Sequence, residues 1–189
     1  MATNAETTWD LTNADGELTV HTGVAGRAAR MGHRLTLLMA SWRITVSWSA
    51  GTPVAGQLVV DVDSLQVLRG EGGVTPLSGA EKAVARGNAV KALQANRFPE
   101  IEFHPETITR SDSGYRLAGP LRIHGVSRAC EVAVVVTDLG DEWQLTCRAE
   151  VRQTDFGVKP FSMMMGAMRV EDVVTVSLDA HRTAPAGLR

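Results

Sequence analysis

The chain has 189 residues and a formal net charge of −2 at pH 7, with 44% hydrophobic, 21% charged and 5% aromatic residues. This length is typical of one domain, and the composition excludes disordered and fibrous classes of protein. No segment concentrates basic residues densely enough to suggest a nucleic-acid groove or an anionic membrane surface, so we expect neither partner. Because aromatic residues are few, we expect an interior built from Val, Leu, Ile, Ala and Met.

The N-terminal segment and the two cysteines bear on cellular location. Residues 1–20 hold no basic region followed by an apolar run, so we expect no secretory signal and a cytoplasmic protein. The longest apolar run, residues 132–136, is far short of the roughly 20 residues of a membrane helix, so we expect no membrane span. Cys130 and Cys147 form no C-x-x-C motif, and we expect them to be reduced thiols.

Apolar and polar residues alternate along the first third of the chain, as is typical of strands with one buried face. Trp42 and Ile44, for example, alternate with Arg43 and Thr45. The alternation predicts strands over residues 17–21, 34–39, 42–49 and 57–63.

Residues 78–96 break this alternation and predict a helix in the middle of the chain. Ser78 and Glu81 have the spacing of a capping box, in which each side chain bonds the backbone N–H of the other residue. Gly87 in the middle of this segment should weaken the helix by about 1 kcal/mol relative to alanine.

Alternation resumes after the helix, and the sequence shows no internal repeat or linker. We therefore expect a mainly β protein with a single domain over residues 1–189, of which about 8–183 form the ordered core. Strands with one apolar face each either close into a barrel or stack as a sandwich, and a barrel of eight strands either fills with side chains or holds one ligand. The later strands are predicted over residues 100–104, 115–124, 129–137, 142–152 and 174–181.

A hairpin around Leu139 and Gly140 relates the two cysteines. A two-residue turn there pairs even positions with odd positions, so Cys130 and Cys147 are expected on the same face, near one another across the ladder.

No motif in the sequence carries catalytic chemistry. The chain has no G-x-S-x-G, P-loop, G-x-G-x-x-G or H-E-x-x-H motif, and the inward phase of its strands is apolar apart from the two thiols. We therefore expect no enzymatic activity, no catalytic residue and no cofactor. Four histidines fall on the polar phase of their strands and are expected at the surface, so that no metal site is predicted: His21, His104, His124 and His181.

Two turns each allow two interpretations. His33 lies in a Gly-flanked turn with the arginines of residues 27–34, which either present cations to a phosphate or form an ordinary solvated loop. The run of methionines at 163–165 is either a flexible surface for a varied apolar partner or a loop packed over the end of the core.

Several segments resemble one known family. FPEIEF at 98–103, GPLRIHGVSRACEVAV at 119–134, DSLQV at 63–67 and the stretch 152–180, which begins RQTDFGV, are similar in chain order to segments of the YceI-like proteins. This resemblance implies a single lipocalin-like antiparallel β-barrel of about eight strands, with a helix packed near one end. It also implies non-enzymatic binding of a long polyisoprenoid or related amphiphile inside the barrel.

The apolar inward phase agrees with an isoprenoid or fatty lipid as the partner, because a buried ligand would have to be an apolar chain with any charged head at the mouth. Two alternatives remain open, namely an enzyme that acts on a hydrophobic substrate through His33 or the thiols, and a stress-related barrel with a filled interior. A homodimer is also left open. The residues expected to line the lipid cavity are Leu37, Ile44, Val46, Leu58, Val60, Phe103, Leu117, Leu121, Val132, Val134, Leu145, Phe156 and Met164, and those expected near a headgroup are Arg27, Arg30, His33, Arg34 and Lys159.

Overall fold

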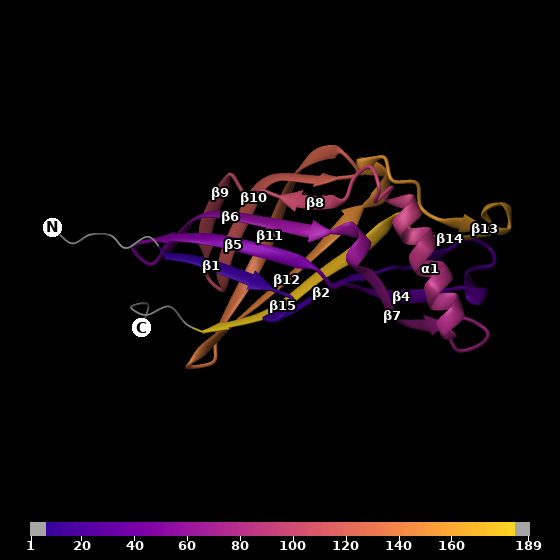
Figure 1. Ribbon diagram of the computed structural model, residues 1–189, viewed down its shortest axis with the longest axis horizontal. Helices are drawn as coiled ribbons and strands as arrows, with labels where there is room; N and C mark the ends of the chain where they lie inside the picture. The colour runs from indigo at the N-terminus through magenta and orange to yellow at the C-terminus, as the bar shows by residue number, and fades with distance from the viewer. Residues whose placement is uncertain (1–6, 184–189) are drawn as a thin grey trace.

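A computed structural model describes residues 7–183 of the chain, which are mainly β with one α-helix, as the sequence predicts (Figure 1). The strands are β1 (Thr7–Thr12), β2 (Gly16–His21), β3 (Val24–Ala25), β4 (His33–Met39), β5 (Trp42–Ser49), β6 (Thr52–Asp61), β7 (Leu65–Gly72), β8 (Glu100–Phe103), β9 (Thr107–Ser111), β10 (Gly114–Ile123), β11 (Val126–Asp138), β12 (Glu142–Arg152), β13 (Ser162–Met163), β14 (Met168–Val170) and β15 (Val173–Thr183). The helices are α1 (Gly79–Ala92) and the short 3-10 helices η1 (Ala29–Met31), η2 (Val62–Ser64), η3 (Gln153–Phe156) and η4 (Met164–Gly166).

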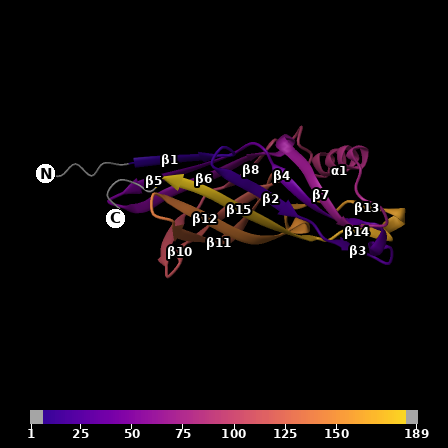
Figure 2. The ribbon, with the colours of Figure 1, turned by 90° about the horizontal axis from the view of Figure 1, so that it is seen from below.

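Twelve of these strands form one antiparallel sheet that curls into a half-barrel (Figures 1 and 2). The strand order is β1-β5-β6-β8-β10-β11-β12-β15-β2-β4-β7, with β9 paired to β10, so β1 and β7 lie at the two edges of the path. The remaining strands form a small sheet in the order β13-β14-β3. The expectation of about eight strands is therefore wrong, since residues 7–183 contain fifteen.

The difference lies in short and edge strands, because every strand predicted from the alternation is present. β1 and β7 pair on one side only, and β9 pairs only with β10. β3, β13 and β14 have two or three residues each, which is too few for a period-two pattern to show. The alternation therefore predicts the central strands of the sheet but not its edge strands or the short strands.

Helix α1 begins with the predicted capping box. The Ser78 N–H donates to Glu81 Oε2 at 2.7 Å, and the Glu81 N–H donates to Ser78 Oγ at 3.3 Å. These bonds from Ser78 also hold the pKa of the Glu81 carboxyl below its ordinary value. The helix ends at Ala92 rather than Asn96, because Gln94 adopts a left-handed conformation with φ of 49° that breaks the helical run.

Side-chain bonds from α1 to β7 hold the helix across one end of the half-barrel (Figure 1). Lys82 Nζ donates to the carbonyl oxygen of Leu68 at 2.6 Å, and Arg86 Nε donates to the carbonyl oxygen of Leu65 at 2.8 Å. Figure 2 shows β3, β13 and β14 at the same end of the molecule. This end is distinct from the opposite one, where the first residues of β1 and the last residues of β5 lie.

The buried core contains an aromatic cluster at the end away from α1. The ring centroids of Trp9 and Trp48 are 4.7 Å apart, and that of Trp143 lies 5.8 Å from Trp9. Tyr115 packs edge-on against Trp48 at 6.3 Å. Three of the four tryptophans of the chain thus gather at one place, although the low aromatic content predicts an interior without them.

Candidate functional site

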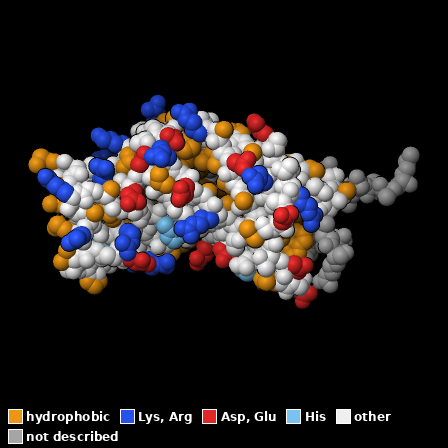
Figure 3. Space-filling model, turned by 180° about the vertical axis from the view of Figure 1, so that it is seen from behind, with side chains coloured by type: hydrophobic (Ala, Val, Ile, Leu, Met, Phe, Trp, Pro, Cys, Tyr) orange, Lys and Arg blue, Asp and Glu red, His pale blue; other side chains and the backbone are white. Residues whose placement is uncertain are grey.

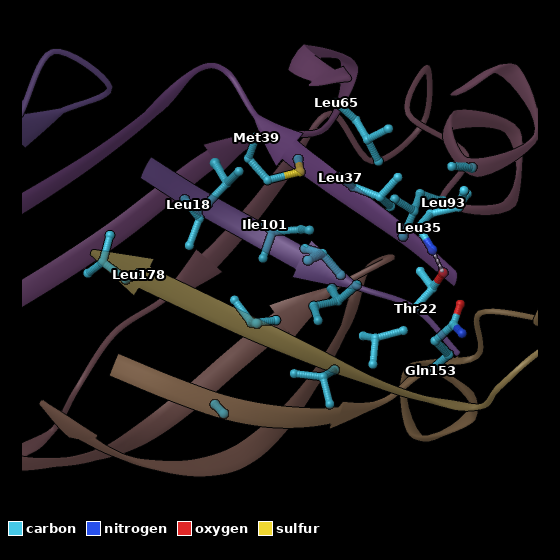
Figure 4. Close-up of a pocket in the computed structure, with 18 of the residues that line it drawn as sticks. Leu18, Thr22, Leu35, Leu37, Met39, Leu65, Leu93, Ile101, Gln153 and Leu178 are labelled. Atoms are coloured by element: carbon cyan, nitrogen blue, oxygen red, sulfur yellow. Dashed lines mark hydrogen bonds between the residues drawn. The ribbon is translucent and has the colours of Figure 1, made fainter. Parts of the chain in front are cut away.

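The inner face of the half-barrel and the inner side of α1 enclose a cavity of about 870 Å³. A volume of this size lies within the range of about 300–1,000 Å³ that is typical of ligand sites. Figure 4 shows aliphatic side chains from several strands pointing into the cavity, among them Leu18, Leu37 and Ile101. The alternation of the strands produces this lining, because every second residue of a strand faces inward.

The aromatic cluster forms one end of the cavity. Trp9, Trp48, Trp143 and Tyr115 all line it, and the first two are only 5% and 7% exposed. The rings therefore close the half-barrel at the end away from α1.

Polar side chains line the cavity chiefly at the opposite end, beside α1 and the small sheet. Thr22 and Gln153 lie together there in Figure 4. Thr22 Oγ1 accepts a hydrogen bond from the Leu35 N–H at 3.1 Å, and Gln153 Nε2 donates to the carbonyl oxygen of Glu171 at 2.9 Å. Asn88 of α1 also lines the cavity. We call this end of the cavity its mouth, because its lining includes exposed residues such as Val84.

All residues predicted to line a lipid cavity face the cavity except Met164. Met164 is exposed and does not line the cavity, whereas Met163 and Met168 on the same hairpin do. The reason is local, since Met164 adopts a left-handed φ of 52° and lies in the turn rather than in a strand. The predicted residues that do line the cavity are Leu37, Ile44, Val46, Leu58, Val60, Phe103, Leu117, Leu121, Val132, Val134, Leu145 and Phe156.

Of the residues predicted near a headgroup, only His33 lines the cavity. An N–H···O contact of 2.8 Å joins its Nε2 to the carbonyl oxygen of Thr75, which holds the ring against the loop before α1. Arg169, which the sequence did not single out, lines the cavity as well. The other four predicted residues are exposed outside it, namely Arg27, Arg30, Arg34 and Lys159.

One histidine departs from its expected place at the surface. His124 lies in the turn between β10 and β11 with φ of 53°, and its ring packs edge-on against Phe98 with centroids 4.8 Å apart. A contact of 3.3 Å joins its Nδ1 to the carbonyl oxygen of Phe156. The alternation misplaced His124 because the strand ends one residue earlier, at Ile123.

Both cysteines line the cavity as free thiols. Burial raises the pKa of the Cys130 thiol. Burial also raises the pKa of the Cys147 thiol, with a smaller contribution from Cys130. A raised pKa keeps a thiol protonated at neutral pH, which is the reverse of what a nucleophilic cysteine needs.

The sequence prediction missed several lining residues for identifiable reasons. Trp9 and Leu11 alternate with polar neighbours in β1, but the alternation contains only these two apolar residues. Ala85, Ala89 and Ala92 of α1 also line the cavity, and their helical spacing places them on one face. Small alanines give only a weak apolar signal.

Neither a metal centre nor a membrane helix is found in the described part of the chain. Among residues 7–183, no group of three or more His, Cys, Asp or Glu side chains is arranged to hold a metal ion. No helix within those residues is both long and apolar enough to cross a bilayer.

Comparisons with known proteins agree with this architecture. BcnA from Burkholderia cenocepacia shares the fold with a TM-score of 0.67 at 15% identity, over 89% of this chain and 96% of BcnA. A YceI protein from Campylobacter jejuni gives a TM-score of 0.52 at 9% identity, over 98% of this chain and 87% of that protein. No curated protein matches the chain. The YceI-like domain matches residues 8–181, and because this range is nearly the whole sequence, the chain belongs to the YceI-like family.

Proposed function

We propose that this protein binds one long, flexible apolar chain, of an isoprenoid or fatty lipid, and carries it without changing it chemically. The observation that supports this function is the cavity of about 870 Å³, whose walls are aliphatic and aromatic from the Trp9 cluster to the mouth. Each CH₂ group that moves from water into such a cavity contributes about 0.8 kcal/mol, so a chain of several prenyl units would bind well despite its ordering cost.

The position of the polar groups supports a ligand with one apolar end and one polar end. Thr22, Asn88 and Gln153 lie at the mouth and supply neutral hydrogen-bonding groups, whereas His33, Glu81 and Arg169 supply ionisable ones. A head that remains at the mouth avoids the large free-energy cost of burying a polar group without a partner. The membership of the YceI-like family and the implied polyisoprenoid ligand agree with this polarity.

Two observations favour binding over the alternatives considered from the sequence. The raised pKa of Cys130 and Cys147 disfavours thiol-based catalysis on a hydrophobic substrate. A barrel with a filled interior would leave no space of 870 Å³ between its side chains. The cytoplasmic location stays a prediction from the sequence.

Two adjacent valines of β11 allow a matched test. Val134 lines the cavity, whereas Val135 is exposed on the other face of the strand. Val134→Trp should fill part of the cavity and weaken binding of a fluorescent geranylgeranyl probe by about tenfold or more, since lost burial of two CH₂ groups alone is worth about 1.6 kcal/mol. Val135→Trp should bind the probe like the wild type.

The test begins with native purification followed by mass spectrometry of extracted lipids. A co-purified prenyl or acyl lipid is expected, together with saturable binding of the probe by the delipidated protein. Wild-type protein that carries no lipid and ignores the probe at micromolar concentration would exclude the proposed function. Equal loss of binding in both valine variants would assign the effect to stability, which thermal unfolding measures separately.

A further inference from the structure

Exposed apolar side chains are concentrated around the mouth of the cavity. Residues 7–183 contain nine large hydrophobic side chains that are exposed, and six of them lie on η1, on the loop before α1, on α1 or on the hairpin of β13 and β14. The other three, Val54, Val135 and Leu139, are spread over other strands and turns. We call the six the apolar collar: Met31, Val74, Val84, Met163, Met164 and Met165.

The collar is continuous with the interior of the protein. Met31, Val74 and Val84 line the cavity although they are exposed, and Val74 is 77% exposed. Met163 likewise lines the cavity and is exposed at the surface. A lipid chain that leaves the cavity would therefore pass directly over these side chains.

Backbone contacts hold the methionine hairpin beside η1. The Ala28 N–H donates to the carbonyl oxygen of Ala167 at 2.9 Å, and β14 pairs with β3 in the small sheet. At the tip, Met164 and Met165 have φ of 52° and 53°, a left-handed conformation that L-residues other than Gly, Asn and Asp seldom adopt. The hairpin thus exposes two large apolar side chains in an unfavourable backbone conformation, and such strained residues are concentrated at binding sites and switch segments.

Basic side chains surround the same end of the molecule. Residues 22–35 and 159–171 together contain five Arg or Lys residues but only one carboxylate, Glu171. Residues 71–84, which carry Val74 and Val84 of the collar, add Lys82 and the carboxylates Glu71 and Glu81. Because the whole chain has 19 basic and 21 acidic residues, these three segments contain six basic and three acidic residues and the rest of the chain 13 and 18, so the charge is asymmetric. Figure 3 shows this end at the left, with exposed hydrophobic side chains in orange beside several blue ones. The five basic residues are Arg27, Arg30, Arg34, Lys159 and Arg169.

These five cations form no ion pair with any residue that the structure describes, although Arg34 lies opposite Glu71 in the pairing of β4 with β7. By contrast, Arg69 pairs with Glu71 and Arg152 with Asp172 at 3.6 Å and 3.5 Å. In the sequence the five cations form no dense run. They become neighbours in space because the pairing of β14 with β3 brings together two segments more than 120 residues apart.

From this arrangement we propose that the mouth docks on the surface of an anionic lipid bilayer, with the apolar collar inserted among the headgroups. Flexible methionine side chains suit a fluid apolar surface, and cations near the membrane surface are attracted to anionic lipids. A bilayer also explains why the collar surrounds the cavity opening, since a lipid chain could then exchange without crossing water. The proposal goes beyond the proposed cargo, because an empty protein would dock equally well.

Co-sedimentation with vesicles tests the docking surface. The full-length protein should bind vesicles of phosphatidylcholine with phosphatidylglycerol, bind pure phosphatidylcholine vesicles much more weakly, and lose binding as the salt concentration rises. Arg27→Gln with Arg30→Gln should weaken binding roughly 25-fold, because each cation near an anionic surface contributes about 1 kcal/mol, or roughly fivefold. Arg110→Gln, on β9 outside these segments, is the matched control and should bind like the wild type.

A second set of variants tests the apolar contribution. Met164→Ser with Met165→Ser should weaken binding to the same vesicles by about tenfold or more, since both side chains are exposed and their removal leaves no cavity in the fold. Leu139→Ser replaces a side chain about as exposed as Met164, in the hairpin between β11 and β12, and should have no effect.

The outcomes separate docking from cargo binding. Val134→Trp, with a partly filled cavity, should still bind anionic vesicles, so docking and the proposed function can fail independently. Wild-type protein that binds neither kind of vesicle overturns the proposal. The proposal is also overturned if the wild-type protein is a dimer that binds no vesicles and that Met165→Ser converts to a monomer. In that case the collar is the contact surface for a second copy of the chain.

Discussion

Cys130 and Cys147 face the same cavity from neighbouring strands but lie at different levels of the ladder. Val134 of β11, rather than Cys130, is the partner of Cys147 in β12. Cys130 lies four positions before Val134 along β11, which corresponds to roughly 13 Å along the strand. Because a disulfide needs Cα atoms closer than about 7 Å, this register leaves both thiols free, although Cys130 still contributes to the raised pKa of Cys147.

The two thiols should make the stability of the protein depend on alkaline pH. Burial raises their pKa in the folded state, so the unfolded chain releases these protons first as the pH rises. Their contribution to stability is complete below the ordinary thiol pKa of about 8.5 and falls as the pH rises through the folded-state pKa. Urea unfolding at pH 7 to 10 should show a smaller alkaline loss for Cys130→Ala with Cys147→Ala than for wild type. Parallel curves for the two proteins would contradict this linkage.

The same thiols report whether the cavity is occupied. A prenyl chain in the cavity would cover both Sγ atoms, so the rate of reaction with a thiol reagent should fall several-fold when the delipidated protein is loaded. A cysteine introduced at the exposed position Val135 supplies the control, because its reaction rate should not depend on the ligand. If Cys147 reacts with the thiol reagent at the same rate in the loaded and the delipidated protein, the ligand lies elsewhere.

Which strand residues face the cavity depends on the local alternation of side chains, so these positions can be read from the sequence. In β5 and β11, for instance, Val46 and Val134 face inward simply because alternate residues of a strand point to opposite faces. The position of Met164 was not predictable in this way, since a turn interrupts the period and a left-handed residue re-aims the side chain.

The two ends of the cavity depend on long-range register, which no local pattern contains. Trp9 meets Trp48 only because β1 pairs with β5, where Trp9 lies opposite Val46. The cations of residues 22–35 and 159–171 likewise become one surface only through the pairing of β14 with β3. Contacts between residues so distant in sequence can be predicted only if the order of the strands in the sheet is known. The alternation missed the edge strands, so this order could not be predicted from the sequence.

Helix α1 offers a stabilising substitution. Gly87 lies in the middle of the helix, and a Cβ at this position would meet no other atom within 4 Å. Gly87→Ala should therefore raise the free energy of unfolding by about 1 kcal/mol, through helix propensity and a less flexible unfolded chain. Chemical denaturation measures this change.

The matched substitution at Gly125 should have the opposite effect. Gly125 has φ of 75° in the turn after β10, and a Cβ there would lie 2.5 Å from Phe98 Cε1. Gly125→Ala should therefore destabilise the protein, because alanine is strained in this conformation and the aromatic ring would have to move. A Gly87→Ala variant no more stable than wild type would show that α1 is limited by its packing rather than by its propensity.

The aromatic cluster should limit the length of the ligand that the cavity accepts. Trp48 is 7% exposed, lines the closed end and touches three other rings, so Trp48→Ala should lower the free energy of unfolding by roughly 3–5 kcal/mol. It should also extend the cavity and improve the binding of longer prenyl probes relative to shorter ones. Trp42 is buried to a similar degree but does not line the cavity, so Trp42→Ala should destabilise the protein without changing this preference. Probe titrations across a series of chain lengths measure the preference, and an identical shift in both variants would mean that the cluster stabilises the fold without setting the depth of the site.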